Sequence, residues 1–127
     1  MTEWKNIPRN KTKYVGFVYK VVEKDTGMIY FGIKKFWRKI RRKPLKGKKR
    51  KRIELIETDW RKYNTSSKIM QKKLAENPSN YTKEIIRPCY KVSDMKAWEA
   101  WYQLDYYVKG DWNKLYNEYI GLRMRIR

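Results

Sequence analysis

The sequence predicts an α+β domain in which a small three-stranded antiparallel or mixed sheet, a β-hairpin plus a third strand, is flanked by helices. Two strand-like segments around a short turn predict the hairpin, and a third strand-like segment lies between two segments with helix-capping signals. The aromatic content of 16% argues against disorder, which requires few large apolar groups. A chain of 127 residues is expected to form a single domain.

The hairpin is predicted from two segments rich in β-branched and aromatic residues, 15–22 and 28–33. A turn centred at residues 24–25 would place Tyr19 directly across from Tyr30. Side chains that face each other across a ladder point the same way, so the two phenols are expected on one face of the hairpin.

A strongly basic segment follows the hairpin. Between residues 34 and 52, thirteen of nineteen residues are Lys or Arg and none is acidic. We expect a short helix at residues 35–42 and then a loop, because Pro44 and Gly47 interrupt any longer helix.

The next helix is predicted to begin after an N-cap at Ser66 or Ser67 and to run to about residue 76, where an Asn-Pro pair stops it. Residues 82–87 then have the composition of the third strand. Pro88 limits that strand, because proline is confined to the ends and edges of sheets.

The longest helix is expected at residues 93–109, ended by Gly110. The tail, residues 112–127, contains enough apolar side chains to pack back on the domain. Residues 1–13 show no sustained period and are interpreted as an N-terminal arm.

The charge of the chain points to a polyanionic partner. Its 33 Lys and Arg against 13 Asp and Glu leave a formal net charge of +20, which favours nucleic acid. No segment is apolar enough to span a membrane and no signal peptide opens the chain, so we expect a cytoplasmic protein without a membrane partner. A single cysteine and no histidine exclude the common zinc sites.

Glu99 is unusual because it falls on the apolar stripe of the predicted long helix. At about 100° per residue, Met95, Trp98, Tyr102 and Tyr106 share that stripe with it. A carboxylate on an apolar face requires a partner. The partner is either a divalent cation, Mg²⁺ first, or one of the many Lys and Arg side chains.

Two motifs resemble a known family. The segment Gly16-Phe17-Val18-Tyr19 and the segment Tyr30-Phe31-Gly32 resemble the first two motifs of the GIY-YIG nucleases, and the likeness extends over residues 15–120. The small, basic bacteriophage enzymes of homing type are the most similar. The resemblance implies a GIY-YIG nuclease-like fold and a metal-dependent DNA endonuclease that hydrolyses phosphodiester bonds, with Mg²⁺ as the cofactor and Mn²⁺ as the alternative.

The resemblance also implies roles for three residues. Glu99 would bind the metal, Tyr19 would activate or orient the attacking water, and Tyr30 would assist by hydrogen bonding. An ordinary phenol has a pKa near 10, but a nearby metal and a cluster of cations would favour the phenolate of Tyr19. Both tyrosines are also suited to a purely structural place in the core.

The cation that would stabilise the transition state is harder to assign, because the position of the family's helical arginine falls on Ile40. Arg41 is our choice and Lys35 the substitute, although each also suits a simple phosphate contact. Many members carry a histidine near this arginine and this chain has none. Asn117 resembles the family's closing asparagine, which helps to orient the active site, although it also suits an ordinary loop position.

Double-stranded DNA is the expected partner, bound by a monomer or by a DNA-bound dimer. The basic segment would grip phosphates, which position the duplex and do not specify its sequence. Tyr63 and Ser66 belong to a stretch that resembles DNA-contacting residues of the phage enzymes, although Ser66 also suits a helix cap. The candidate DNA contacts are Lys34, Arg38, Arg42, Lys46, Lys48, Lys49, Arg50, Arg52, Tyr63 and Ser66.

Two alternatives to an enzyme remain open. The first is a basic DNA- or RNA-binding protein on the same scaffold without a catalytic step. The second is an RNA-associated structural protein, supported only by charge.

Overall fold

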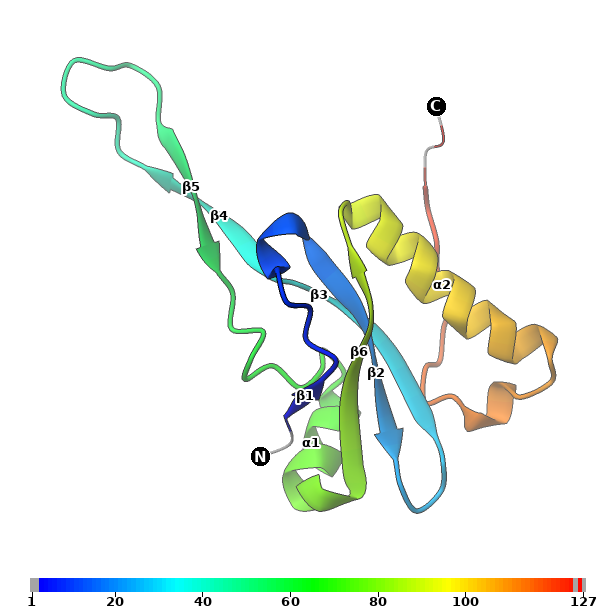
Figure 1. The fold of residues 1–127 in the computed structure, drawn as a ribbon. Coiled ribbons are helices and arrows are strands. Elements are labelled where there is room, and N and C mark those ends of the chain that lie inside the picture. Colours follow the sequence, from blue (N-terminus) through cyan, green and yellow to red (C-terminus); the bar gives the residue numbers. More distant parts are fainter. Residues whose placement is uncertain (1–2, 125, 127) are drawn as a thin grey trace.

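The computed structural model describes residues 3–124 and 126, and it has an α+β fold (Figure 1). Its main sheet is four-stranded and mixed, in the order β1-β6-β2-β3, and a separate two-stranded sheet pairs β4 with β5. The strands are β1 (Trp4–Lys5), β2 (Gly16–Glu23), β3 (Ile29–Lys35), β4 (Trp37–Arg42), β5 (Arg52–Glu57) and β6 (Tyr81–Cys89). The helices are α1 (Lys68–Glu76) and α2 (Val92–Val108), with 3₁₀ turns at Lys11–Lys13, Pro78–Asn80 and Trp112–Lys114.

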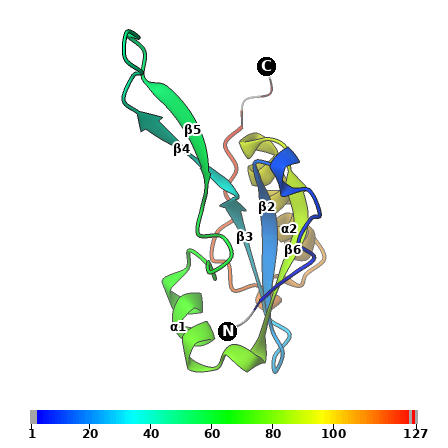
Figure 2. The same ribbon diagram turned by 60° about the vertical axis from the view of Figure 1, so that its left-hand side comes forward.

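The main sheet carries a separate apolar cluster on each face. On one face α1 inserts Met70 and Leu74 against Tyr19 and its neighbours on β2. On the other face α2 inserts Met95 against Val18. The sheet therefore separates the two helices, as Figure 2 shows.

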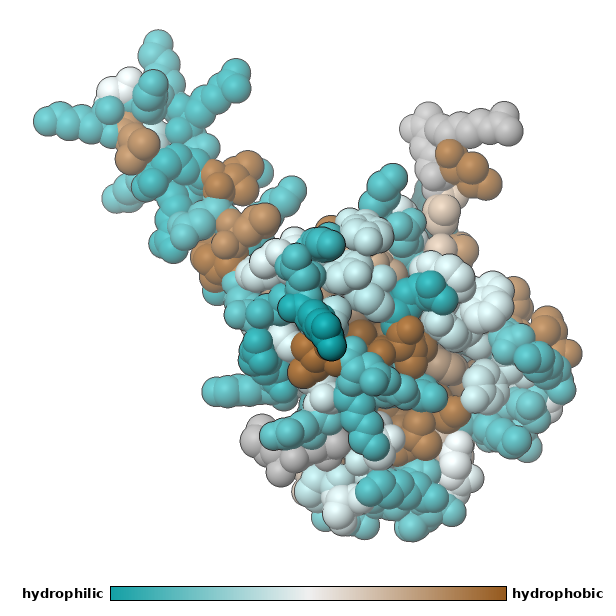
Figure 3. Space-filling model, in the orientation of Figure 1, coloured by the Kyte–Doolittle hydropathy of each residue, from teal (hydrophilic) through white to brown (hydrophobic). Residues whose placement is uncertain are grey.

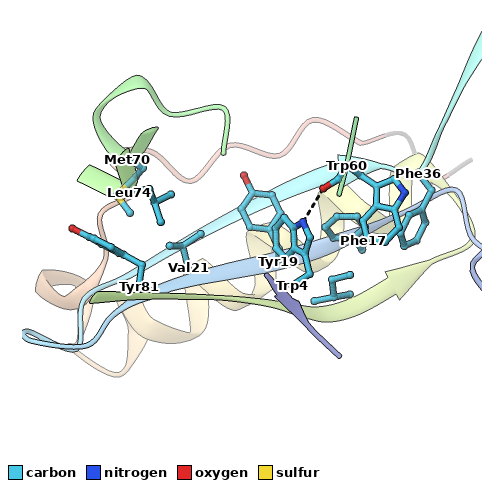
Figure 4. Close-up of a cluster of buried hydrophobic side chains, with 10 residues drawn as sticks. Trp4, Phe17, Tyr19, Val21, Phe36, Trp60, Met70, Leu74 and Tyr81 are labelled. Atoms are coloured by element: carbon cyan, nitrogen blue, oxygen red, sulfur yellow. Dashed lines mark hydrogen bonds between the residues drawn. The ribbon is translucent and has the colours of Figure 1, made fainter. Parts of the chain in front are cut away.

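The fourth strand comes from the segment predicted as an arm. Trp4 is buried and its ring packs edge-to-face on Phe17 and Tyr19, at 5.3 and 5.2 Å between centroids. Its indole Nε1 donates a 2.7 Å hydrogen bond to the carbonyl of Trp60 (Figure 4). Burial of this ring fixes the N-terminal segment beside β6, so the prediction of a three-stranded sheet was one strand short.

The register of the hairpin differs from the prediction by two residues. Tyr19 lies opposite Gly32, and Tyr30 lies opposite Val21. The turn is centred between Asp25 and Thr26, one residue later than expected, and a turn shifted by one residue moves the pairing by two. Because the side-chain period of a strand is two, Tyr19 and Tyr30 still share one face, with 6.4 Å between ring centroids.

The helix predicted at residues 35–42 is wrong, because β4 pairs there with β5 as an antiparallel ribbon. On a helix Arg38 and Arg42 would lie one turn apart and repel. In the ribbon Arg42 lies opposite Arg52 and makes a 2.8 Å ion pair with Glu54, two residues further along that strand. We call residues 37–57, the ribbon and its connecting loop, the basic arm. It projects from the body of the molecule and is mainly hydrophilic (Figures 1 and 3).

The two helices are close to their predicted positions. The hydroxyl of Ser67 accepts the amide of Met70 at 3.4 Å, so Ser67 and not Ser66 is the N-cap of α1. Helix α2 begins one residue before the predicted Ser93, with no side-chain cap, and is followed by Gly110 at a φ of 81°. None of the helices in the described part of the chain is long and apolar enough to cross a membrane.

The tail packs back over only its first residues. Leu115 forms a bridge with Ile29, and the amide of Tyr116 donates to the carbonyl of Ile29 at 2.8 Å. Further along the tail, all of which was expected to pack on the domain, Tyr119 and Leu122 are exposed. The third strand, β6, is longer than predicted and includes Pro88, which lies beyond the two-residue stretch that β1 covers.

Lys83 on β6 is a buried cation that the sequence analysis did not identify. Its ammonium donates to the carbonyl of Tyr63 and to Oδ1 of Asn64, both at 2.9 Å, and lies 4.5 Å from the ring centroid of Trp4. Burial lowers the pKa of Lys83 to about 8. The lysine ties the loop before α1 to the sheet.

We predict that Gly32→Ala destabilises the fold. A Cβ at this position would overlap the hydroxyl of Tyr19 and lie 2.8 Å from its Cε1, so the core would be overpacked. Urea denaturation should show a loss of about 1–3 kcal/mol in the free energy of unfolding. Gly121→Ala is the control, because nothing lies within 4 Å of its added Cβ, and it should change stability by less than about 0.5 kcal/mol. Equal effects of the two changes would contradict this account of the hairpin.

A second prediction concerns pH and Lys83→Met. Between the folded pKa of about 8 and the unfolded value of about 10.5, the unfolded chain binds more protons, so the wild type gains stability as the pH rises. Other titrating groups are common to both proteins and cancel in the difference. The difference between the free energy of unfolding of the wild type and that of Lys83→Met should therefore increase from pH 8 to pH 10. The increase should be at most about 1.4 kcal/mol per pH unit. A constant or decreasing difference would show that Lys83 is not held in this way.

Candidate active site

A hollow of about 700 Å³ lies along the outer edge of β3. Its walls come from β3, the N-terminal end of α1, the middle of α2 and the tail that follows α2. We call it the β3-edge hollow. The polar side chains around it include Tyr30, Ser66, Lys68, Glu99, Gln103 and Asn117. Residues separated by most of the chain length thus meet at one place.

Glu99 contributes the carboxylate of this hollow. It is half-buried on α2, and burial raises the pKa of its carboxyl group. Within the described residues it forms no ion pair with a Lys or Arg side chain and no hydrogen bond. The alternative of a pairing with a nearby cation is therefore not found there.

The donor set around Glu99 fits a small, hard cation. Among the described residues, no group of three Asp, Glu, His or Cys side chains could hold a metal ion. Mg²⁺ does not need such a group, because it keeps several waters and is bound through one or two carboxylates together with substrate phosphate. A single unpaired carboxylate beside an open hollow matches that pattern.

The two tyrosines occupy different environments. Tyr30 is half-buried and lines the hollow, whereas Tyr19 is fully buried and does not. The hydroxyl of Tyr19 lies 3.4 Å from Oγ1 of Thr65. Burial raises the pKa of Tyr19, so in the protein alone the neutral phenol is the favoured form.

Neither predicted catalytic cation lies in the β3-edge hollow. Arg41 is exposed in the basic arm opposite Ile53, and Lys35 is exposed at the end of β3. The reason is the ribbon, which carries the chain away from the sheet at the point where we expected a helix. The cationic side chain that lines the hollow is Lys68, in the first turn of α1, which the sequence analysis missed.

Asn117 lines the hollow with its hydrogen-bonding groups already occupied. Its Oδ1 accepts the amide of Phe31 at 2.9 Å, and its Nδ2 donates to the carbonyl of Phe31 at 2.8 Å. Asn117 thus extends the edge of β3 in place of a further strand. Tyr116 beside it donates to Glu23 at 2.8 Å, which also fastens the tail.

The loop before α1 contains a polar residue whose place was not predicted. Thr65 is buried, and its hydroxyl accepts the amide of Ser67 at 3.2 Å beside the hydroxyl of Tyr19. The threonine thereby connects the loop to the hairpin through its hydroxyl. Because Ser67 caps α1, the exposed Ser66 is left free to face the hollow.

A second hollow of about 1330 Å³ lies at the base of the basic arm. It is lined by basic side chains from four segments: Lys13, Lys34, Lys35, Arg38, Lys39 and Lys96. Ile33 borders both hollows, so the two hollows adjoin each other at β3.

The predicted DNA contacts differ in their availability. Lys34 forms a 2.8 Å ion pair with Asp59 and lies 4.2 Å from the ring centroid of Tyr63, so both Lys34 and Tyr63 have partners within the protein. Arg42 is paired with Glu54. The remaining predicted cations are exposed on the arm: Arg38, Lys46, Lys48, Lys49, Arg50 and Arg52.

Comparison with known proteins agrees with this geometry. A family model described as "Putative endonuclease segE, GIY-YIG domain" matches residues 2–120. No curated protein and no solved structure matches the chain. The family consists of nucleases that act on DNA and generally use divalent metal ions. Since the match covers nearly the whole sequence, the chain belongs to the GIY-YIG endonuclease family.

Proposed function

We propose that this chain is a metal-dependent endonuclease that hydrolyses phosphodiester bonds of double-stranded DNA in the β3-edge hollow. The observation that carries the proposal is the unpaired carboxylate of Glu99 in the same hollow as the phenol of Tyr30 and the first turn of α1. Glu99 would hold Mg²⁺, or Mn²⁺ as the alternative, together with a phosphate oxygen and waters. When bound, the cation would neutralise charge on the phosphate.

The first turn of α1 is suited to receive the scissile phosphate. The amides of Lys68 and Ile69 have no acceptor within the helix, and the positive end of the helix dipole points the same way. The ammonium of Lys68 adds a full positive charge. Lys68 therefore takes the place that we first gave to Arg41 or Lys35, since a transition-state cation must reach the phosphate.

Tyr30 is the phenol that can meet the attacking water, because it lines the hollow. We assign the water-orienting role to Tyr30 and a supporting role to Tyr19. The buried ring of Tyr19 packs beside Tyr30, and its hydroxyl lies against Thr65, so Tyr19 holds the hairpin and the loop before α1 in place. This reverses the order of the two roles that the family resemblance implied.

The basic arm would bind the duplex beside the hollow. Its tip carries exposed Lys and Arg side chains, and a two-stranded ribbon matches the width of the major groove. The second hollow, at the base of the arm, would guide the backbone toward Glu99. Contacts of this kind bind phosphates without reading sequence.

Two observations favour the alternative of a DNA- or RNA-binding protein without catalysis. The hydroxyl of Tyr19 is covered, and the arginine expected at the site lies on the arm. In that case Glu99 would have no chemical role, and the hollow would bind a phosphate without cutting beside it.

Cleavage of a supercoiled plasmid in the presence of Mg²⁺ tests the enzyme proposal. We expect Glu99→Gln and Tyr30→Phe each to lower the first-order cleavage rate by at least about 100-fold, because each removes a group at the reacting phosphate. Tyr19→Phe should lower it by less than about tenfold. Filter binding should give nearly unchanged affinity for all three variants. A wild type that binds the plasmid and never cuts it would refute the proposal.

The arm is tested by changing Lys48, Lys49, Arg50 and Arg52 together to Ala. Each lost phosphate contact should reduce the slope of log affinity against log salt by about 0.9, or by about 3.6 for four contacts. The control removes the same charge from exposed lysines outside the arm, namely Lys5, Lys24, Lys72 and Lys91. If both sets reduce the slope equally, the arm has no special part in binding.

A further inference from the structure

Gln103 is a buried polar residue to which the fold and the proposed chemistry assign no role. It lies on α2 and only 3% of its surface is exposed. Its Oε1 is the one buried side-chain nitrogen or oxygen in the described part of the chain that lacks a hydrogen-bond partner. An amide oxygen buried in this way costs free energy, and nearly all such atoms in folded proteins have a donor.

The position of Gln103 indicates where that donor would come from. Residues four apart on a helix lie one above the other, so Gln103 is directly beside Glu99, and both line the β3-edge hollow. Two acceptors, one of them anionic, therefore lie together with no protein donor between them. In the protein alone this oxygen has almost no surface open to water, so the amide must turn about its last bond to bring the oxygen to the hollow. A hydrated cation would then satisfy both acceptors, because it neutralises the carboxylate and its waters donate hydrogen bonds.

We propose that Gln103 is a positioning residue whose amide oxygen accepts a hydrogen bond from a water in the hydration shell of the divalent cation held by Glu99. The inference rests on the metal site of the proposed function. A neutral amide suits this place, because a second carboxylate would repel the incoming phosphate. Partners of this outer kind orient the ligands of a metal and raise its affinity.

The test combines metal binding with stability for Gln103→Met, which keeps the length of the side chain and removes the amide. Mn²⁺ binding to the protein, measured by electron paramagnetic resonance, should weaken by about tenfold. In the absence of metal, the melting temperature of the variant should equal or exceed that of the wild type, because an unsatisfied buried acceptor has been removed. A merely structural glutamine would give the opposite sign for stability.

Two further variants complete the experiment. Gln103→Glu retains an acceptor and should bind Mn²⁺ at least as tightly as the wild type. In a Glu99→Gln background, Gln103→Met should cause no further loss of Mn²⁺ affinity, since the two residues act on one ion.

Three results would overturn the inference. They are unchanged Mn²⁺ affinity of Gln103→Met, a metal-free melting temperature well below that of the wild type, and additive losses in the double variant. If the wild type itself binds no Mn²⁺, the metal site of the proposed function fails and this inference fails with it. If the wild type binds Mn²⁺ and Gln103→Met binds it equally well, this inference fails and the proposed function stands.

Discussion

The ring of Tyr19 lies across the backbone of Gly32, and the arrangement of the site depends on this contact. A side chain at Gly32 would occupy the space of the phenol, so the hairpin can pair in this register only with glycine there. The contact places Tyr19 inside the core and leaves its neighbour Tyr30 at the edge. The same ring then meets Thr65, which connects the hairpin to the loop before α1.

The site forms because several segments are fastened around the edge of β3. Asn117 bonds to both backbone groups of Phe31, and Lys83 on β6 holds the loop before α1. Between these attachments the hollow keeps acceptors that the protein does not satisfy, on Glu99 and Gln103. Acceptors without donors are costly in the protein alone and become favourable when a cation and a phosphate arrive.

The charge of the protein is divided between two surfaces. The basic arm holds a large share of the net charge of +20 far from the core, where like charges are separated by water and repel less. The hollow has Lys68 and the amides of α1 opposite Glu99. In the proposed function the basic arm attracts the duplex, and the β3-edge hollow acts on a single phosphate.

Local signals identified most of the main elements. The cap at Ser67, the glycine after α2 and the β-branched runs of β2, β3 and β6 each act over a few residues, so their positions were found to within a few residues. Residues 35–42 were wrongly predicted to form a helix, because the strand pairing of the arm joins residues ten or more positions apart. The cross-strand partners Glu54 and Glu57 lie outside any short window of sequence around β4. The strand at Trp4 was missed for the same reason, since that indole finds its partners at Phe17 and Trp60.

Helical spacing drew attention to Glu99, and the family resemblance drew attention to Tyr30, Ser66 and Asn117; all four line one hollow. The folded chain decided three further points: that the phenol of Tyr19 is covered, that Lys68 is the cation at the hollow, and that the amide oxygen of Gln103 lacks a donor. Burial and unsatisfied hydrogen bonds arise only when distant segments pack together, and no window of the sequence contains both sides of such a contact. For this reason the burial of Tyr19, the place of Arg41 on the arm and the positions of Lys68 and Gln103 at the hollow became clear only from the tertiary structure.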